Sequence, residues 1–288
     1  MQYNEKDEIV IDELKLCYIA DREQMASLAE VAVGSSVELY HYKFYRFLNE
    51  RFRFFFEVVE DGVKVAQLKF GHYTDTEEAP LYVYLKVLNP VLYDAERLQC
   101  LLMLPDKFGM VFNNFTAVDL ALDGGVNFPS LIKRMMRDKT VTTIINGKAV
   151  KNRKKVLQGV SFEYSSTLDR LNHPTITVKQ KKAIANKCDG ISVQAYDKKA
   201  EIDHQSDKHY ILDHYGNPKR LYRLEIRLHY RELKDYFAML DKYPVPEDLF
   251  DAEGLKMMFF YHLSAVIRFS RGRRKIDWET LLKCNGRV

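Results

Sequence analysis

Apolar and polar residues alternate along many short segments of the chain, and a period of two residues is typical of strands. The segment EIVIDELKLCYIA at residues 8–20 is the first of these, and Asp61 with Gly62 marks a hairpin turn further on. Strands are predicted at residues 8–20, 37–59 (as one or two strands), 63–72, 80–90, 115–123, 141–146, 156–165, 174–181, 190–199 and 220–230.

Helical periodicity and helix-start signals lie between these strands. Asp94 is a candidate N-cap, and Pro129 suits the first turn of a helix. Helices are predicted at residues 21–33, 94–108, 128–138, 231–240 and 247–269. This order of elements predicts an α+β protein with a large, mostly antiparallel sheet and helices packed on one face.

No linker-like segment divides the chain. We expect one α+β domain over residues 1–270, with 1–139 and 140–270 as candidate related halves, and a basic C-terminal tail at 271–288. The 288 residues are 47% hydrophobic and 29% charged, which is ordinary for a soluble globular protein. No run of about 18 apolar residues occurs, so a membrane span is not predicted.

The N-terminal segment is polar and acidic, unlike a secretory signal. The four cysteines are widely spaced and form no CxxC pair, so neither a zinc finger nor a disulfide scaffold is predicted. A reducing, cytoplasmic location fits this pattern best.

Positive charge is concentrated in one part of the chain. Residues 133–199 hold 16 Lys/Arg against 5 Asp/Glu, whereas the whole chain has a net charge of only +4. Such a block is typical of a protein that binds a polyanion, although a solvated basic surface is an equal alternative. The candidate DNA-binding residues are Lys151, Arg153, Lys154, Lys155, Lys179, Lys181 and Lys182, and a further basic run occupies 271–275.

Four of the predicted strands place polar groups on the face that does not carry the apolar residues. If these strands are neighbours, Asp119, Glu163 and Glu225 converge. Three carboxylates are ligands that Mg²⁺ or Mn²⁺ accepts. Tyr196 shares such a face and can act as a nucleophile beside a cation, with Lys198 two residues away. The alternative is the ordinary polar outer face of a half-exposed sheet.

Two segments carry a family resemblance. They read QAYDKKAE at 194–201 and YRLEIR at 222–227, and they are preceded by AVDLALD at 117–123 and, more loosely, GVSFEYSS at 159–166. Their order and spacing resemble the plasmid-type replication initiation factors, the Rep_trans type of rolling-circle initiator. Filamentous-phage gene II/X replication proteins and some conjugative-element relaxases have similar signatures. The resemblance covers about residues 110–240.

The resemblance implies metal-dependent DNA nicking and strand transfer through a 5′-phosphotyrosine. It implies Tyr196 as the nucleophile, Lys198 and Arg223 as groups that stabilise the phosphate, and Mg²⁺ or Mn²⁺ held by Asp119, Glu225 and Glu163. Origin DNA would be the partner, together with a host helicase and a second copy of the chain. A conjugative relaxase and a non-catalytic DNA-binding protein remain as alternatives.

Two other features have a functional and a structural interpretation. His204, His209 and His214 recur every five residues in a segment that we expect to be a loop, so a shared metal is the less favoured interpretation. The run from Tyr40 to Phe56 mixes aromatic residues with cations and can stack single-stranded bases. Strand core with its cations reaching the surface is the favoured interpretation.

Overall fold

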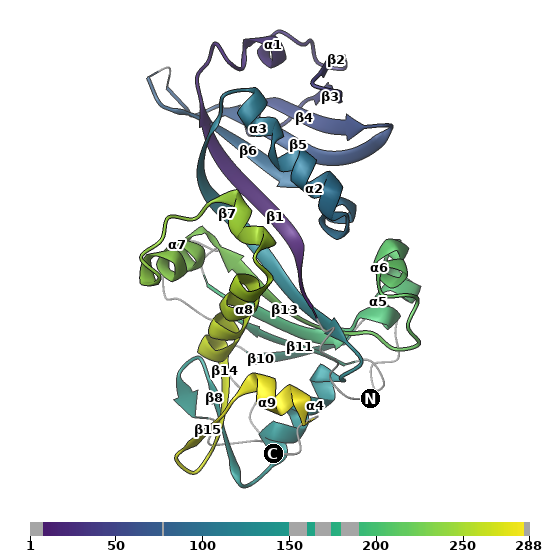
Figure 1. Ribbon diagram of the computed structural model, residues 1–288, viewed down its shortest axis with the longest axis vertical. Helices are drawn as coiled ribbons and strands as arrows, with labels where there is room; N and C mark the ends of the chain where they lie inside the picture. Colours follow the sequence, from purple (N-terminus) through teal and green to yellow (C-terminus); the bar gives the residue numbers. More distant parts are fainter. Residues whose placement is uncertain (1–7, 77, 150–159, 165–173, 180–189, 285–288) are drawn as a thin grey trace. The chain divides into compact units, whose positions relative to one another are not determined.

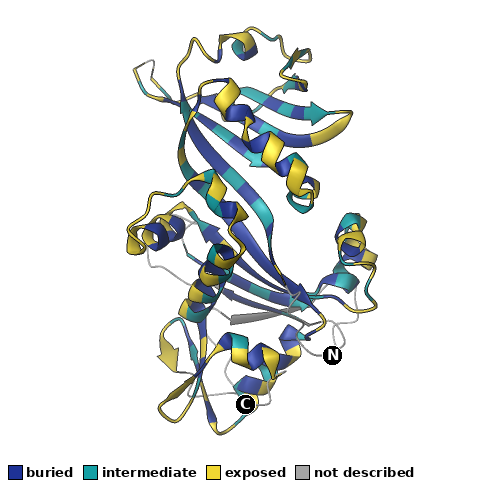
Figure 2. Cartoon of the chain, in the orientation of Figure 1, coloured by how far each residue is buried: buried dark blue, intermediate teal, exposed yellow. Residues whose placement is uncertain are grey.

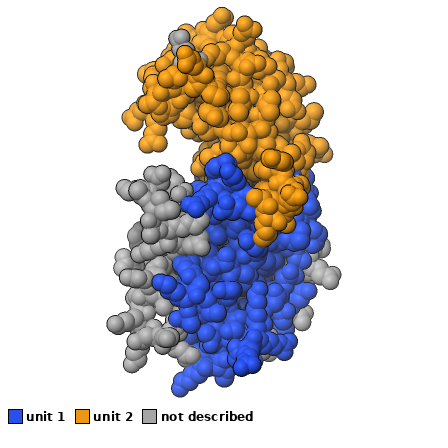
Figure 3. Space-filling model, turned by 90° about the vertical axis from the view of Figure 1, so that its left-hand side faces the viewer, with its two compact units in different colours: residues 1–11, 119–236, 248–288 blue, residues 12–118, 237–247 orange. Residues whose placement is uncertain are grey.

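The computed structural model describes residues 8–76, 78–149, 160–164, 174–179 and 190–284 (Figure 1). The fold is α+β, as predicted, with a large antiparallel sheet and a smaller four-stranded one. The chain divides into two compact units, which are described separately below (Figure 3). Unit 1 consists of residues 1–11, 119–236 and 248–288, and unit 2 of residues 12–118 and 237–247.

Unit 2 is built on strands in the order β1-β6-β5-β4-β3-β2, each antiparallel to its neighbour. The strands are β1 (Ile9–Ala20), β2 (Ser36–Leu39), β3 (Tyr42–Phe47), β4 (Phe52–Glu60), β5 (Val63–His72) and β6 (Leu81–Val87). The helices are α1 (Ala26–Ala29), the 3-10 helix η1 (Asn89–Tyr93), α2 (Ala95–Leu102) and α3 (Leu104–Lys107).

The side chains on one face of this sheet form the hydrophobic core of the unit (Figure 2). Phe44 and Phe56 are fully buried, and Phe44 contacts Phe108, which follows α3, edge to face. The Asp94 side chain accepts a hydrogen bond from Arg97 N, so the predicted N-cap of α2 is confirmed. The helix expected at 21–33 is only α1, because few of its apolar residues are buried.

Unit 1 contains strands in the order β10-β11-β12-β13-β7. These are β7 (Val111–Gly124, of which 119–124 lie in this unit), β10 (Val160–Tyr164), β11 (Pro174–Lys179), β12 (Ser192–Asp197) and β13 (Tyr222–His229). The smaller sheet has the order β15-β14-β8-β9, from β8 (Val141–Ile145), β9 (Lys148–Ala149), β14 (Ile267–Arg271) and β15 (Arg274–Ile276).

Helices cover the apolar face of the sheet in unit 1. Helix α4 contacts β11, β12 and β13 through its apolar stripe, which includes the buried Leu131 and Met135. Helix α8 contacts β13 and buries Phe259 and Leu263. The helices with residues in this unit are α4 (Phe128–Arg137), α5 (Lys198–Gln205), α6 (His209–His214), α7 (Tyr230–Met239), η2 (Pro246–Phe250), α8 (Ala252–Val266) and α9 (Trp278–Lys283).

Two expectations about the chain's organisation need correction. The supposed tail at 271–288 is folded through residue 284: Trp278 is 2% exposed and its Nε1 donates to Ile267 O at 2.9 Å. The apolar residues Trp278, Leu281 and Leu282, which follow the basic run, are buried. The histidine-rich loop is instead α5 and α6, which bury Ile202 and Ile211.

The two units divide at residues 11/12, 118/119, 236/237 and 247/248, not at 139/140. The reason is that β1 and β7 are long strands that contribute residues to both units. Within the described ranges, no helix has the length and apolar character needed to cross a membrane.

Candidate active site

Two carboxylates of β7 pair with two arginines of β13. Arg227 Nε lies 3.0 Å from Oδ1 and 2.8 Å from Oδ2 of Asp119, and its Nη2 lies 2.5 Å from Oδ2. Arg223 Nε lies 2.7 Å from Oδ1 of Asp123, and its Nη2 lies 2.6 Å from Oδ2. Residue numbers increase along β7 from one pair to the other and decrease along β13, so the two strands are antiparallel. The four side chains are separated by even numbers of residues on each strand and share one face.

The two ion pairs differ in their access to solvent. The side chains of Arg223 and Asp123 are both 0% exposed. Arg227 is 45% exposed, although its partner Asp119 is 2% exposed. A phosphate therefore has no access to Arg223 in this arrangement, and the Arg223–Asp123 pair holds two strands together. Arg227 is the arginine of this face that solvent, and hence a ligand, can reach.

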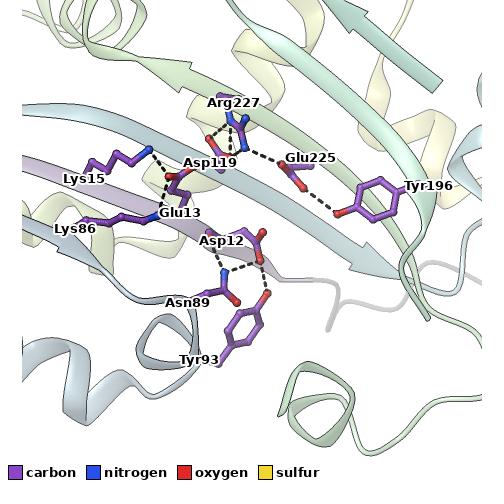
Figure 4. A network of polar contacts seen from close by, with 10 residues as sticks. All are labelled: Asp12, Glu13, Lys15, Lys86, Asn89, Tyr93, Asp119, Tyr196, Glu225 and Arg227. Carbon is purple, nitrogen blue, oxygen red and sulfur yellow. Dashed lines mark hydrogen bonds and ion pairs between the residues drawn. The ribbon is translucent and has the colours of Figure 1, made fainter. Parts of the chain in front are cut away.

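Tyr196 lies on the same face, on β12. The β12–β13 register places it opposite Arg223 and places Gln194 opposite Glu225. The Tyr196 side chain reaches the diagonal neighbour instead, and its Oη donates to Glu225 Oε2 at 3.0 Å. The other oxygen of Glu225, Oε1, is 3.9 Å from Arg227 Nη2. Tyr196, Glu225, Arg227 and Asp119 thus form one chain of polar contacts (Figure 4).

Lys198 lies beside Tyr196, but its charge is already paired. It is the first residue of α5, where the Asp197 side chain caps the helix by accepting from Ala200 N at 2.9 Å. Its side chain is 2% exposed, and Nζ is 2.7 Å from Glu201 Oε2 and 5.7 Å from the Tyr196 ring centroid. A contact with the tyrosine ring fits Lys198 as a positioning group better than as a phosphate ligand.

Glu163 does not lie on a strand next to the other two expected metal ligands. The register places it on β10 opposite Thr175, and β10 is three strands from β13 and four from β7. At about 4.8 Å between neighbouring strands, its backbone is roughly 14 Å from β13 and 19 Å from β7. The alternation of residues along one strand does not give the order of the strands across the sheet.

Arg227 and Glu201 are the functional candidates that the sequence analysis left without a role. Arg227 follows Glu225 by two residues, so the period of two residues already placed it on the polar face. Glu201 follows Lys198 by three residues, which is the spacing of ion pairs along a helix. Both spacings can be seen in the sequence. The functional interest of each residue depends on the side chain with which it pairs, and only the structure shows that side chain.

The described residues assemble no cluster of three or more metal-ligating side chains. Asp119 and Glu225 nevertheless lie on adjacent strands with the Arg227 guanidinium next to both. Mg²⁺ commonly binds through one or two carboxylates, with waters and a substrate phosphate completing its coordination. The two carboxylates therefore fit this mode of binding, whereas the order of the described strands does not bring the backbone of Glu163 next to them.

The predicted DNA-binding residues fall largely outside the described part of the chain. This applies to Lys151, Arg153, Lys154, Lys155, Lys181 and Lys182, and only the backbone of Lys179 is described, in β11. No protein-family model and no curated protein matches the chain.

Proposed function

We propose that the protein is a cytoplasmic DNA nicking and strand-transfer enzyme that uses Tyr196 to initiate rolling-circle replication. In this reaction Tyr196 Oη forms a bond to phosphorus, and the bond from phosphorus to the 3′ oxygen breaks. The products are a 5′-phosphotyrosine and a free 3′-hydroxyl. The phenol proton passes to Glu225, and the leaving oxygen takes a proton from solvent. Reversal of these steps rejoins a strand.

One observation carries this proposal: Tyr196 Oη donates to Glu225 Oε2 at 3.0 Å. A hydroxyl nucleophile needs an adjacent base within this range of distances. The base is in turn 3.9 Å from Arg227, which is bound to Asp119. Tyr196, Glu225 and Arg227 thus lie on one face in the order that a nucleophile, its base and a group that orients the base require.

Arg227 supplies the positive charge for the reacting phosphate in this scheme. Its fork of donors matches phosphate oxygens, and its 45% exposure lets it turn towards a ligand. Phosphoryl transfer depends mainly on positioning and on charge neutralisation. Asp119 and Glu225 are the residues that would hold Mg²⁺ or Mn²⁺, which would supply charge that stabilises a phenolate and a phosphate.

A basic hollow on α4 supports a DNA partner. It has a volume of 560 Å³ and is lined by Ser130, Lys133, Arg134, Arg137 and Asp138. Burial lowers the pKa of Lys133 first, and crowding by the positive charge of the nearby Arg137 lowers it further. A DNA phosphate relieves such crowding, and this favours a polyanion at this surface.

The cysteines are compatible with the proposed compartment. Among the described residues Cys17, Cys100 and Cys284 are free thiols, as expected of a protein in a reducing cytoplasm. A host helicase follows from the mechanism, because nicking alone does not separate strands.

The test is covalent capture of DNA. Labelled single-stranded and supercoiled DNA carrying a candidate origin is incubated with the protein and Mn²⁺ or Mg²⁺, and denaturing gels reveal the adduct. We expect an adduct with the native protein that is absent with Tyr196→Phe and after chelation of the metal. The matched control is Tyr222→Phe, which removes a hydroxyl from the neighbouring strand and should leave the adduct unchanged.

Two results would contradict the proposal. Binding without any adduct would favour a non-catalytic DNA-binding protein. An adduct that persists in Tyr196→Phe would preserve the chemistry and assign it to another tyrosine. A conjugative relaxase forms the same phosphotyrosine, so an origin with an inverted repeat beside the gene, rather than this assay, favours the replication initiator.

A further inference from the structure

The sheet of unit 2 has one face packed against helices and a second face of mixed aromatic and basic residues. Along β3 the residues alternate between the two: Tyr42 and Phe44 are 1% and 0% exposed, whereas Phe47 is 43% exposed. Lys43 is also exposed and lies beside the half-buried Tyr45, with Nζ 4.9 Å from the centre of its ring. The aromatic run of the sequence therefore serves two purposes, and only alternate residues belong to the core.

Strand register aligns the outward residues in rows. One row crosses four strands, from Phe47 to Phe55, Lys69 and Tyr84. Within it, the rings of Phe47 and Phe55 are 6.3 Å apart, and Lys69 Nζ is 5.1 Å from the centre of the Phe55 ring. The next row crosses five strands and consists of Tyr45, Glu57, Gln67, Lys86 and Lys15.

One further ring, that of Phe52, contacts this face. It lies 5.6 Å from the ring of Tyr84, edge to face. Gly71 has φ +65°, and both Gly71 and Arg53 are absent from the β4–β5 register between Phe54–Phe70 and Phe52–His72. A Cβ at position 71 would also lie 3.1 Å from the Phe54 ring, so glycine suits this close approach.

The face carries an excess of positive charge around Lys69. Burial lowers the pKa of Lys69 first, and the nearby Lys86 and Lys15 lower it further. Glu13 pairs with both of those lysines (Figure 4). Glu57 pairs with Lys64 at 2.6 Å. None of the ion pairs found in the described ranges involves Lys69, so an anion near its Nζ would be stabilised.

We propose that this face of unit 2, formed by the outward residues of β3, β4, β5 and β6, binds single-stranded nucleic acid. Bases stack on exposed aromatic rings, and lysines between the rings neutralise the phosphates. A duplex keeps its bases stacked on one another, so the rings favour single strands. The inference goes beyond the proposed nicking activity and does not depend on Tyr196, because every residue that carries it lies in unit 2.

Binding of a fluorescent oligothymidylate of about 16 nucleotides to the full chain tests this proposal by anisotropy. Phe55→Leu and Tyr84→Leu keep apolar volume in the sheet but remove a ring, and each should weaken binding by about tenfold. Tyr243→Leu is the matched control, since Tyr243 is 93% exposed and lies in the same unit outside the sheet. Circular dichroism and melting temperature confirm that each variant is folded.

Photocrosslinking locates the strand directly. An oligonucleotide containing 5-iodouracil is irradiated with the protein, and the attached peptides are identified by mass spectrometry. We expect attachment at Phe55 or Tyr84, both with the native chain and with Tyr196→Phe. The proposal is overturned if crosslinks occur only in residues 119–236, or if both ring variants bind as tightly as the control. Absence of the covalent adduct from the native protein, with these crosslinks retained, would instead reject the nicking activity alone.

Discussion

The two units differ in how far the polar residues of their sheets are buried. All nine buried polar or charged residues found in the described ranges belong to unit 1, whereas every buried core residue of unit 2 is hydrophobic. In unit 1 the polar face holds carboxylates and an arginine that are buried and paired, next to the half-buried Tyr196 and the exposed Arg227. In unit 2 the corresponding residues are lysines and aromatic rings with partial exposure to solvent.

This difference indicates a division of roles. Buried charges are costly unless they are paired in good geometry, so a network such as that around Glu225 fits a site that positions reacting groups. Half-exposed rings and lysines need no network of ion pairs to hold them in place, and they can bind a long flexible ligand. The same alternation of residues along a strand therefore leads to different chemistry, depending on whether the polar face is covered.

The largest expected effect concerns the base in unit 1. Glu225→Gln keeps the shape of the side chain but removes its ability to accept the Tyr196 proton. We expect the rate of adduct formation to fall by about 10²–10⁴-fold. Single-turnover gels at saturating DNA measure this rate, and Gln194→Glu adds a carboxylate on the neighbouring strand as a test of position. An unchanged rate in Glu225→Gln would show that the hydrogen bond is only structural.

The second-largest expected effect is on stability, and it differs between the two ion pairs of the polar face in unit 1. Asp123→Asn removes the carboxylate that pairs with the fully buried Arg223, and we expect the free energy of unfolding to fall by about 3–5 kcal/mol. Asp119→Asn should cost only about 1 kcal/mol, because the exposed Arg227 can turn to water. Denaturant titrations of both variants measure the difference, and equal losses would contradict the distinction between the pairs.

Buried His262 makes unit 1 sensitive to acid. Burial lowers the pKa of His262 to about 4 from an ordinary value of 6.5, so the unfolded chain binds the proton more readily. His262 therefore favours the neutral folded state, and stability falls as pH decreases from 6.5 to 4, by about 3 kcal/mol in total. Unfolding of native protein and of His262→Phe at several pH values tests this, because the variant should lose that part of the slope.

The smallest effect concerns a single phosphate contact in unit 2. Lys69→Gln should reduce the slope of log binding constant against log salt by about 0.7, the value for one phosphate of a single strand. Stability should change little, because Lys69 makes no ion pair with another described residue. Lys242→Gln, in a different part of the unit, provides the comparison. An unchanged salt slope in Lys69→Gln would separate this lysine from the binding surface.

The sequence predicted the faces of the strands better than their neighbours. It placed Asp119, Glu225 and Arg227 on a polar face, and the ion pairs confirm this. It did not predict that Arg227, rather than a third carboxylate, lies between the two acids. The convergence of Glu163 with them failed for the same reason, since alternation along one strand contains no information on strand order.

By itself the sequence determined the α+β class, most strand positions and the alternation of polar and apolar faces. These are local properties, set by the geometry of the extended backbone and by the burial of apolar side chains. The tertiary structure decided which faces are covered, which charges meet and which aromatic residues of Tyr40–Phe56 point outward. These depend on strand order and packing between segments far apart in the chain, whose energies no short stretch of sequence contains.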